Sequence, residues 1–175
     1  MKLLITIVVC LVVGLVVIAG VIALIGSRLP KAHTASRSVV LHQSRQQVYK
    51  VVRDFPAAAT WRSDVKRIEI TSQPGDRVRF REHGKNGDVN YELFEDLPGE
   101  RMVTRILDTD LGYSGKWTYA FAEENGATRV TITEDGEVAN VIFRFMSRYI
   151  FGHTATLDSY LTSLAKHFGE TATPQ

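Results

Sequence analysis

Residues 141–168 read VIFRFMSRYIFGHTATLDSYLTSLAKHF, and this stretch decides the fold that the sequence predicts. Apolar residues recur along it at helical spacing, which predicts one long amphipathic helix over the whole stretch. Asn140 suits the N-cap and Gly169 suits the position after the last turn. Such a helix would be roughly 42 Å long and could cross an entire sheet. Gly152, inside it, marks either close packing or a bend, because Gly costs about 1 kcal/mol relative to Ala in a helix.

One stripe of this helix should face the rest of the domain. Its members are Ile142, Phe145 or Met146, Tyr149, His153, Leu157, Tyr160 or Leu161, Leu164 and Phe168. A single His on an apolar stripe is more often a hydrogen-bonded core residue than part of a binding site. Both interpretations of His153 stay open. If the stripe faces a cavity, Tyr149 and His153 are candidate ligand-binding residues.

Two basic residues, Arg144 and Arg148, lie one turn apart among apolar residues of the same stretch. Apolar residues on nearly all sides with basic ones between them are typical of a segment that contacts a membrane surface or a partner. The alternative is a solvated pair whose aliphatic stems cover apolar neighbours. We expect the solvated pair.

Upstream of this helix the period of the apolar residues changes from helical to two, which predicts strands. Six runs follow one another: Val65–Ile70, Arg77–Glu82, Val89–Leu93, Met102–Ile106, Trp117–Phe121 and Val130–Ile132. Turn sequences separate them, among them Gln73-Pro74-Gly75-Asp76 and Asn86-Gly87, the latter typical of a type I′ hairpin. A seventh run, Arg37–His42, comes first. Short connections predict an antiparallel sheet in which each strand of the meander pairs with the next.

A short helix is predicted between the first two strands. Ser44-Arg45-Gln46-Gln47 has the form of a capping box, and the apolar residues after it follow at helical spacing. Pro56 should end this helix near Phe55. An antiparallel sheet with one solvated face must bury the other, and the C-terminal helix is the long apolar element that can cover it. The fold class is therefore α+β.

Three aromatic residues on the strands are candidates for the space between sheet and helix. Trp117 and Tyr119 share a face if their strand turns these residues inward, and Tyr91 has the equivalent place on its own strand. Aromatic bodies with polar tips suit a pocket for a flat or amphiphilic ligand, although they fill a core equally well. Together with Tyr149 and His153 they form the predicted ligand-binding set. Trp61 is expected to plug one end of the sheet.

The N-terminus predicts a membrane anchor. Residues 3–25 contain no charged residue, and at about 1.5 Å per residue they span the roughly 30 Å of a hydrocarbon core. This run is too long for a cleaved signal peptide, and Val9 before Cys10 does not fit a lipoprotein signal. We therefore expect an anchor over residues 1–27, a linker over 28–35, one domain over 36–170 and a tail over 171–175.

The charge of the chain is small, with 21 Lys and Arg against 19 Asp and Glu. Three of the basic residues, Lys2, Arg28 and Lys31, precede residue 36, so the domain itself is nearly neutral and gives no argument for nucleic-acid binding. More basic residues follow the span than precede it. The positive-inside rule therefore favours a single-pass cell-membrane protein with its domain in the cytoplasm, by a margin of one or two charges.

The order of these elements resembles the helix-grip fold of the START-like (SRPBCC) superfamily, which includes polyketide cyclase/dehydrase-like proteins. The resemblance rests on Ser44, Val48-Tyr49, Asp54-Phe55, Trp61 and Val65. It rests also on the closing pattern Gly126-x-Thr128-x-Val130-x-Ile132-x-Glu134 and on Leu157-Asp158-x-Tyr160-Leu161-x-x-Leu164. It covers about residues 36–170. The resemblance implies a seven-stranded sheet wrapped on a long C-terminal helix, with a cavity for lipid-like or aromatic molecules and no shared catalytic residues.

No strong catalytic motif occurs in the chain, and its five His residues lack the spacing of metal ligands. We therefore assign no catalytic residue, no metal and no cofactor. Three functions remain open. The first is membrane-anchored binding of a hydrophobic or lipid-like molecule. The second is a cyclase- or dehydratase-type enzyme with a cavity His or Tyr as general acid or base. The third is a scaffold with a filled core that acts through protein contacts.

Overall fold

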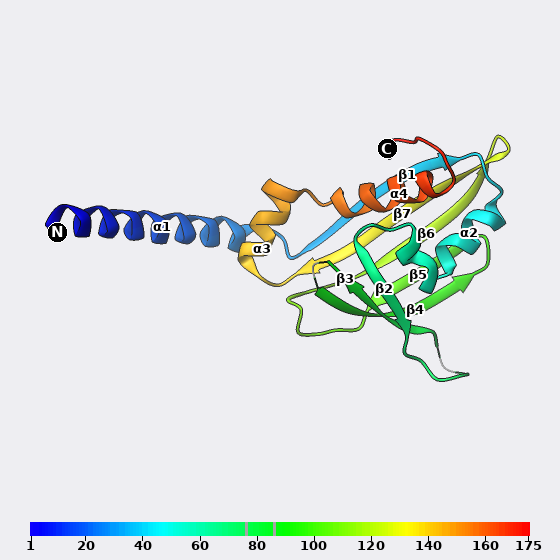
Figure 1. The fold of residues 1–175 in the computed structure, drawn as a ribbon, viewed down its shortest axis with the longest axis horizontal. Coiled ribbons are helices and arrows are strands. Elements are labelled where there is room, and N and C mark those ends of the chain that lie inside the picture. Colours follow the sequence, from blue (N-terminus) through cyan, green and yellow to red (C-terminus); the bar gives the residue numbers. More distant parts are fainter. Residues whose placement is uncertain (76, 86) are drawn as a thin grey trace.

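The computed structural model describes residues 1–75, 77–85 and 87–175, apart from the side chain of Phe151. Helix α1 (Lys2–Arg28) projects from the domain, and Figure 1 shows it extending along the longest axis of the molecule. It is the helix in the described part of the chain that is long and apolar enough to cross a membrane, and the domain does not bury its most apolar stretch. Cys10 is exposed on this helix.

Seven strands form one antiparallel sheet. They are β1 (Ala32–Leu41), β2 (Val65–Ile70), β3 (Arg79–Gly84), β4 (Gly87–Leu97), β5 (Arg101–Ile106), β6 (Tyr113–Glu124) and β7 (Ala127–Val138). Their order in the sheet is β1-β7-β6-β5-β4-β3-β2. The six consecutive strands pair with their neighbours, as the short connections predict, and β1 pairs with β7 at the far edge. The α+β helix-grip prediction is confirmed.

The helices lie where they cover one face of this sheet. Helix α2 (Arg45–Arg53) and the 3₁₀ helix η1 (Pro56–Thr60) close the end of the sheet away from α1, and α4 (Ala155–His167) packs along its inner face (Figure 1). The predicted capping box is confirmed, because the Ser44 hydroxyl accepts from the Gln47 backbone and the Gln47 side chain accepts from the Ser44 backbone. The core between α4 and the sheet includes Leu161 and Ile132, both fully buried.

The long C-terminal helix predicted over residues 141–168 is wrong. The chain forms α3 (Val141–Met146), a π-helical turn η2 (Ser147–Phe151), a break, and then α4. At the break Gly152 has φ 75° and ψ 157°, a conformation that residues with a Cβ rarely adopt. The break turns α3 and η2 away from the axis of α4, toward the end of α1 (Figure 1). Asn140 caps α3 as predicted, since its side chain accepts from Ile142 and Phe143.

Two other segments, the expected linker and the expected tail, also differ from the sequence predictions. Strand β1 begins at Ala32, inside the expected linker 28–35, which leaves three residues between α1 and the sheet. The expected tail folds back, and the backbone of Gln175 forms two hydrogen bonds of 2.9 Å with Ser38 on β1. Asp76 and Asn86 lie outside the described residues, so the turns predicted at 73–76 and at 86–87 stay predictions.

Candidate functional site

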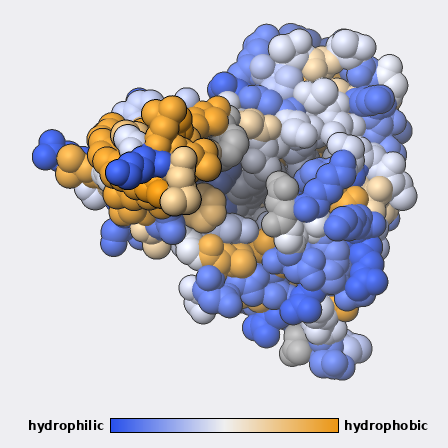
Figure 2. Space-filling model, turned by 60° about the vertical axis from the view of Figure 1, so that its left-hand side comes forward, coloured by the Kyte–Doolittle hydropathy of each residue, from blue (hydrophilic) through white to orange (hydrophobic). Residues whose placement is uncertain are grey.

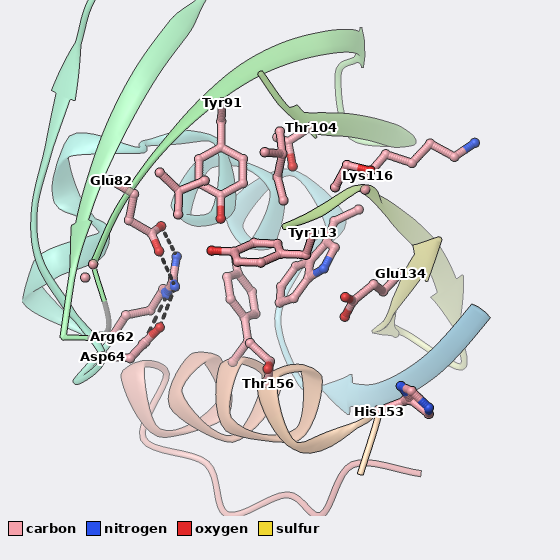
Figure 3. A pocket seen from close by; sticks show the side chains of 18 of the residues that line it. Arg62, Asp64, Glu82, Tyr91, Thr104, Tyr113, Lys116, Glu134, His153 and Thr156 are labelled. Carbon is pink, nitrogen blue, oxygen red and sulfur yellow. Dashed lines mark hydrogen bonds and ion pairs between the residues drawn. The ribbon is translucent and has the colours of Figure 1, made fainter. Parts of the chain in front are cut away.

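A cavity of about 540 Å³ lies between the inner face of the sheet and α4. Its walls come from α2, η1, all seven strands and the α3–α4 region, and Figure 3 shows polar side chains of its lining. The apolar part of the lining comprises Val52, Phe55, Ala58, Ile68, Phe80, Val89, Ile106, Val138 and Phe143. A volume of this size is in the usual range for small-molecule sites, roughly 300–1,000 Å³.

One end of the cavity holds an ion cluster in which Arg62 and Glu82 are largely buried. The Arg62 guanidinium donates to Glu82 at 2.7 and 3.1 Å and to Asp64 at 2.6 Å (Figure 3). It also lies 5.2 Å from the centre of the Tyr160 ring. Burial acts to lower the pKa of Arg62, but Glu82 and Asp64 outweigh burial and raise it. Arg62 therefore stays a cation, held between two carboxyl groups beside the cavity.

Tyrosines form the middle of the cavity. Tyr160 on α4 contacts Trp117 and Tyr119 on β6, with ring centres 5.8 Å apart in each pair. Burial raises the pKa of Tyr119 to about 12 and also raises the pKa values of Tyr91 and Tyr160. These phenols are therefore neutral at physiological pH. Neutral phenols can donate hydrogen bonds to a ligand and present apolar ring faces to it.

The other end of the cavity holds two stacked imidazoles and a carboxyl group. His33 on β1 stacks on His153, with ring centres 4.3 Å apart, and its Nε2 lies 3.6 Å from the Glu134 carboxyl. Burial raises the pKa of Glu134, outweighing a hydrogen bond from Trp117. Burial lowers the pKa values of His33 and His153. The pKa of the acid is thus raised while the pKa values of the two imidazoles are lowered.

Four of the five residues predicted to bind a ligand lie around this cavity. Tyr91, Trp117, Tyr119 and His153 line it. Tyr149 does not, because the break at Gly152 takes η2 off the axis of α4 and leaves the Tyr149 side chain 59% exposed beside Phe145. Trp61, which we expected to plug one end of the sheet, packs edge-on against Tyr160, with ring centres 5.2 Å apart.

Several polar residues of the cavity were not predicted. Glu82 lies two residues after Phe80, and Glu134 lies two residues after Ile132, so each continues the inward alternation of its strand. Extending the alternation by one more step therefore finds both as acidic side chains on an apolar face. Arg62 sits just after η1 and carries no such signal, because only the fold brings it to Glu82. Within residues 1–75, 77–85 and 87–175, no group of three or more His, Cys, Asp or Glu side chains is placed to bind a metal ion.

Solved structures with the same fold show how widely it occurs. A START superfamily protein from Mycobacterium smegmatis is 15% identical, with TM-score 0.61, and covers 77% of this chain and 96% of its own. The Zhui aromatase/cyclase from Streptomyces sp. R1128 is 14% identical, with TM-score 0.58 and coverages of 78% and 96%. Norcoclaurine synthase from Thalictrum flavum is 10% identical, with TM-score 0.60 and coverages of 78% and 93%. At these identities the likeness concerns the fold alone.

Sequence comparison gives a family. No curated protein matches the chain. A family model described as polyketide cyclase / dehydrase and lipid transport matches residues 32–168, from the first residue of β1 to the residue after α4. This match takes in every strand and every cavity-lining element described above. The chain therefore belongs to the polyketide cyclase/dehydrase and lipid transport family, with a START-like fold.

Proposed function

We propose that the protein is a membrane-anchored binding protein that takes up a hydrophobic or lipid-like small molecule. The observation that carries the proposal is the cavity of about 540 Å³ between the sheet and α4. Its apolar walls suit the body of such a ligand, and the polar groups at its two ends suit a ligand with hydroxyl or carbonyl groups. A scaffold function would be supported by a filled core, so the cavity argues against it.

The anchor part of the proposal rests on α1. Its 27 residues would be about 40 Å long, and the helix carries exposed apolar side chains on every side. Such a surface is stable in lipid and unfavourable in water. The basic residues after the span favour a cytoplasmic domain. A reporter that is active only outside the cytoplasm, fused after Gln175, should be inactive, and its activity would reverse this orientation.

Native mass spectrometry of the full chain, purified in mild detergent, tests the ligand. We expect an apolar compound to co-purify with the wild type and to be lost from Val89→Trp, because Val89 lines the cavity and a larger side chain would fill it. The matched control is Ile70→Trp, since Ile70 is an exposed apolar residue outside the cavity. A wild type without any bound compound, or equal retention by the two variants, would contradict the proposal.

A second function, acid–base catalysis of the cyclase or dehydratase type, is favoured by one specific observation. Glu134 and the stacked pair His33 and His153 converge on one end of the cavity, with the pKa shifts described above. Glu134→Gln keeps the shape of the side chain and replaces its carboxyl group with an amide, which cannot act as an acid or a base. If the protein is an enzyme, the wild type should convert the co-purified compound on prolonged incubation while Glu134→Gln retains it unchanged. Identical compounds recovered from both would favour binding alone.

A further inference from the structure

A second cavity, of about 450 Å³, lies where the chain passes from α1 into β1. The segment 29–34, the end of β7, the α3–η2 region and His153 line it. Its cationic residues are Lys31, Arg144 and Arg148, and two imidazoles, His33 and His153, lie beside them. In the described part of the chain no Asp or Glu lines it. Glu134 approaches His33 from the cavity between the sheet and α4 instead, which we call the ligand cavity. We call this second cavity the basic pocket.

Arg144 is the buried member of the basic pocket. Only 9% of it is exposed, contrary to the solvated pair expected from the sequence. Its two terminal nitrogens donate to the backbone oxygens of Leu29 and Ala139, each at 3.0 Å. Its Nε is buried and has no hydrogen-bond acceptor. Carbonyl oxygens do not neutralise a cation, and a buried cation without a counter-charge is unfavourable. An anion in the pocket would supply the missing charge.

The basic pocket lies at the depth of lipid head groups if α1 spans the bilayer. The end of α1 packs so closely on the start of α3 that a Cβ at Gly26 would collide with the backbone oxygen of Val141. Next to this contact, the α3–η2 segment exposes four large apolar side chains: Ile142, Phe143, Tyr149 and Ile150. Figure 2 shows the apolar α1 from near its free end, with the surface of the domain hollowed beside it. Apolar side chains next to basic ones are typical of a segment that lies in the membrane interface.

We propose that the basic pocket binds the phosphate group of an anionic phospholipid in the leaflet that faces the domain. Arg and Lys at the end of a membrane span attract anionic head groups, and an Arg that already holds its neighbours in place is well suited to a phosphate. The proposal rests on α1 being the anchor proposed above. It adds a lipid class and a site that differ from those of the cavity between sheet and α4.

The basic pocket and the ligand cavity share a wall. His33, Val138 and His153 line both. A lipid whose head group occupies the basic pocket therefore lies next to the end of the ligand cavity that holds the stacked imidazoles. This arrangement places the ligand cavity beside the bilayer surface rather than away from it.

Lipid selectivity of the full chain tests the proposal. The protein is held in mixed micelles that contain equal amounts of phosphatidylglycerol and phosphatidylcholine with the same acyl chains, and native mass spectrometry counts the lipids retained. The variant is the double substitution Lys31→Gln and Arg148→Gln, both at exposed positions. The control is Arg28→Gln, which removes one positive charge beside the membrane but outside the basic pocket, so that losses are compared per charge.

We expect the wild type to retain phosphatidylglycerol preferentially and the double variant to lose more than about fivefold of that preference for each charge removed, because contact with the phosphate adds to the general surface attraction. Arg28→Gln should lose at most about fivefold, because this residue contributes the general attraction alone. Equal losses per charge in variant and control would overturn the proposal, since they indicate general surface attraction. The proposal would also be overturned if the wild type bound inorganic phosphate and the double variant did not, while the wild type showed no preference for phosphatidylglycerol.

The anchor is tested separately on the same protein. A spin label on the native Cys10, reconstituted in phosphatidylcholine vesicles, should be accessible to oxygen and protected from a water-soluble relaxation agent. A label exposed to water would refute the anchor. A label in the hydrocarbon, together with no lipid preference, would refute only the basic pocket.

Discussion

Removing Arg62 should destabilise the domain far more than removing a surface arginine with a similar ion pair. The side chains of Arg62 and Glu82 are 12% and 15% exposed, whereas Asp64 is 43% exposed and already well solvated. Arg62→Leu therefore leaves mainly the Glu82 carboxylate buried without a partner. Loss of one member of a buried pair costs about 3–5 kcal/mol. For a domain of this size we expect the melting temperature to fall by about 10 °C or more.

The matched control is Arg67→Leu. Arg67 pairs with Glu69 at 2.8 Å, but both side chains are about half exposed, so its removal should cost about 1 kcal/mol or less. A double variant, Arg62→Leu with Glu82→Leu, removes both buried charges and should recover most of the loss. Thermal unfolding of the full chain in detergent, followed by the fluorescence of its tryptophans, measures all three. Equal effects at Arg62 and Arg67, or no recovery in the double variant, would refute the reasoning.

Two further predictions concern the break before α4 and the outer face of the sheet. Gly152→Ala should lower the free energy of unfolding by about 1–3 kcal/mol, because Ala disfavours this backbone conformation, while Gly20→Ala on the exposed α1 should leave the domain unchanged in the same thermal assay. Burial acts to raise the pKa of the Glu92 carboxyl, but hydrogen bonds from Arg105 and Arg79 outweigh it and lower the pKa. Stability from this lowered pKa is present at neutral pH and is lost as the pH falls below about 4, so Glu92→Gln should be less stable than the wild type at pH 7 and nearly equal to it in acid. A constant difference across that range in pH-dependent unfolding would contradict the assignment.

Local patterns predicted the parts of the fold that local chemistry determines. The capping box at Ser44 and the antiparallel meander follow from interactions between residues close in sequence, and the structure confirms both. The break at Gly152 does not follow in this way. Helical spacing continues on both sides of the glycine, and the choice between a bend and a straight helix depends on packing of α3 against the end of α1, more than 100 residues earlier.

The same distinction between local patterns and distant contacts explains which residues of the candidate site could be predicted. Tyr91 and Tyr119 were found because strand alternation sends them to the inner face. Arg62 was not, since it meets Glu82 only through the pairing of β2 with β3 and the position of η1. Arg144 was expected in solvent, because its apolar neighbours in sequence gave no sign that Leu29 and Ala139 would enclose it. Pairings between distant elements were thus beyond the reach of the sequence patterns.

If the protein is the anchored binding protein proposed above, the short joint between α1 and the sheet limits where it can exchange a ligand. Only Leu29, Pro30 and Lys31 separate α1 from β1, and three extended residues reach about 10 Å. Contacts of Gly26 with Val141 and of Arg144 with Leu29 restrict even that reach. With α1 in the bilayer, the domain cannot travel across an aqueous compartment as a shuttle. Its cavity would load and unload at the surface of its own membrane, and any recipient would have to come to that surface.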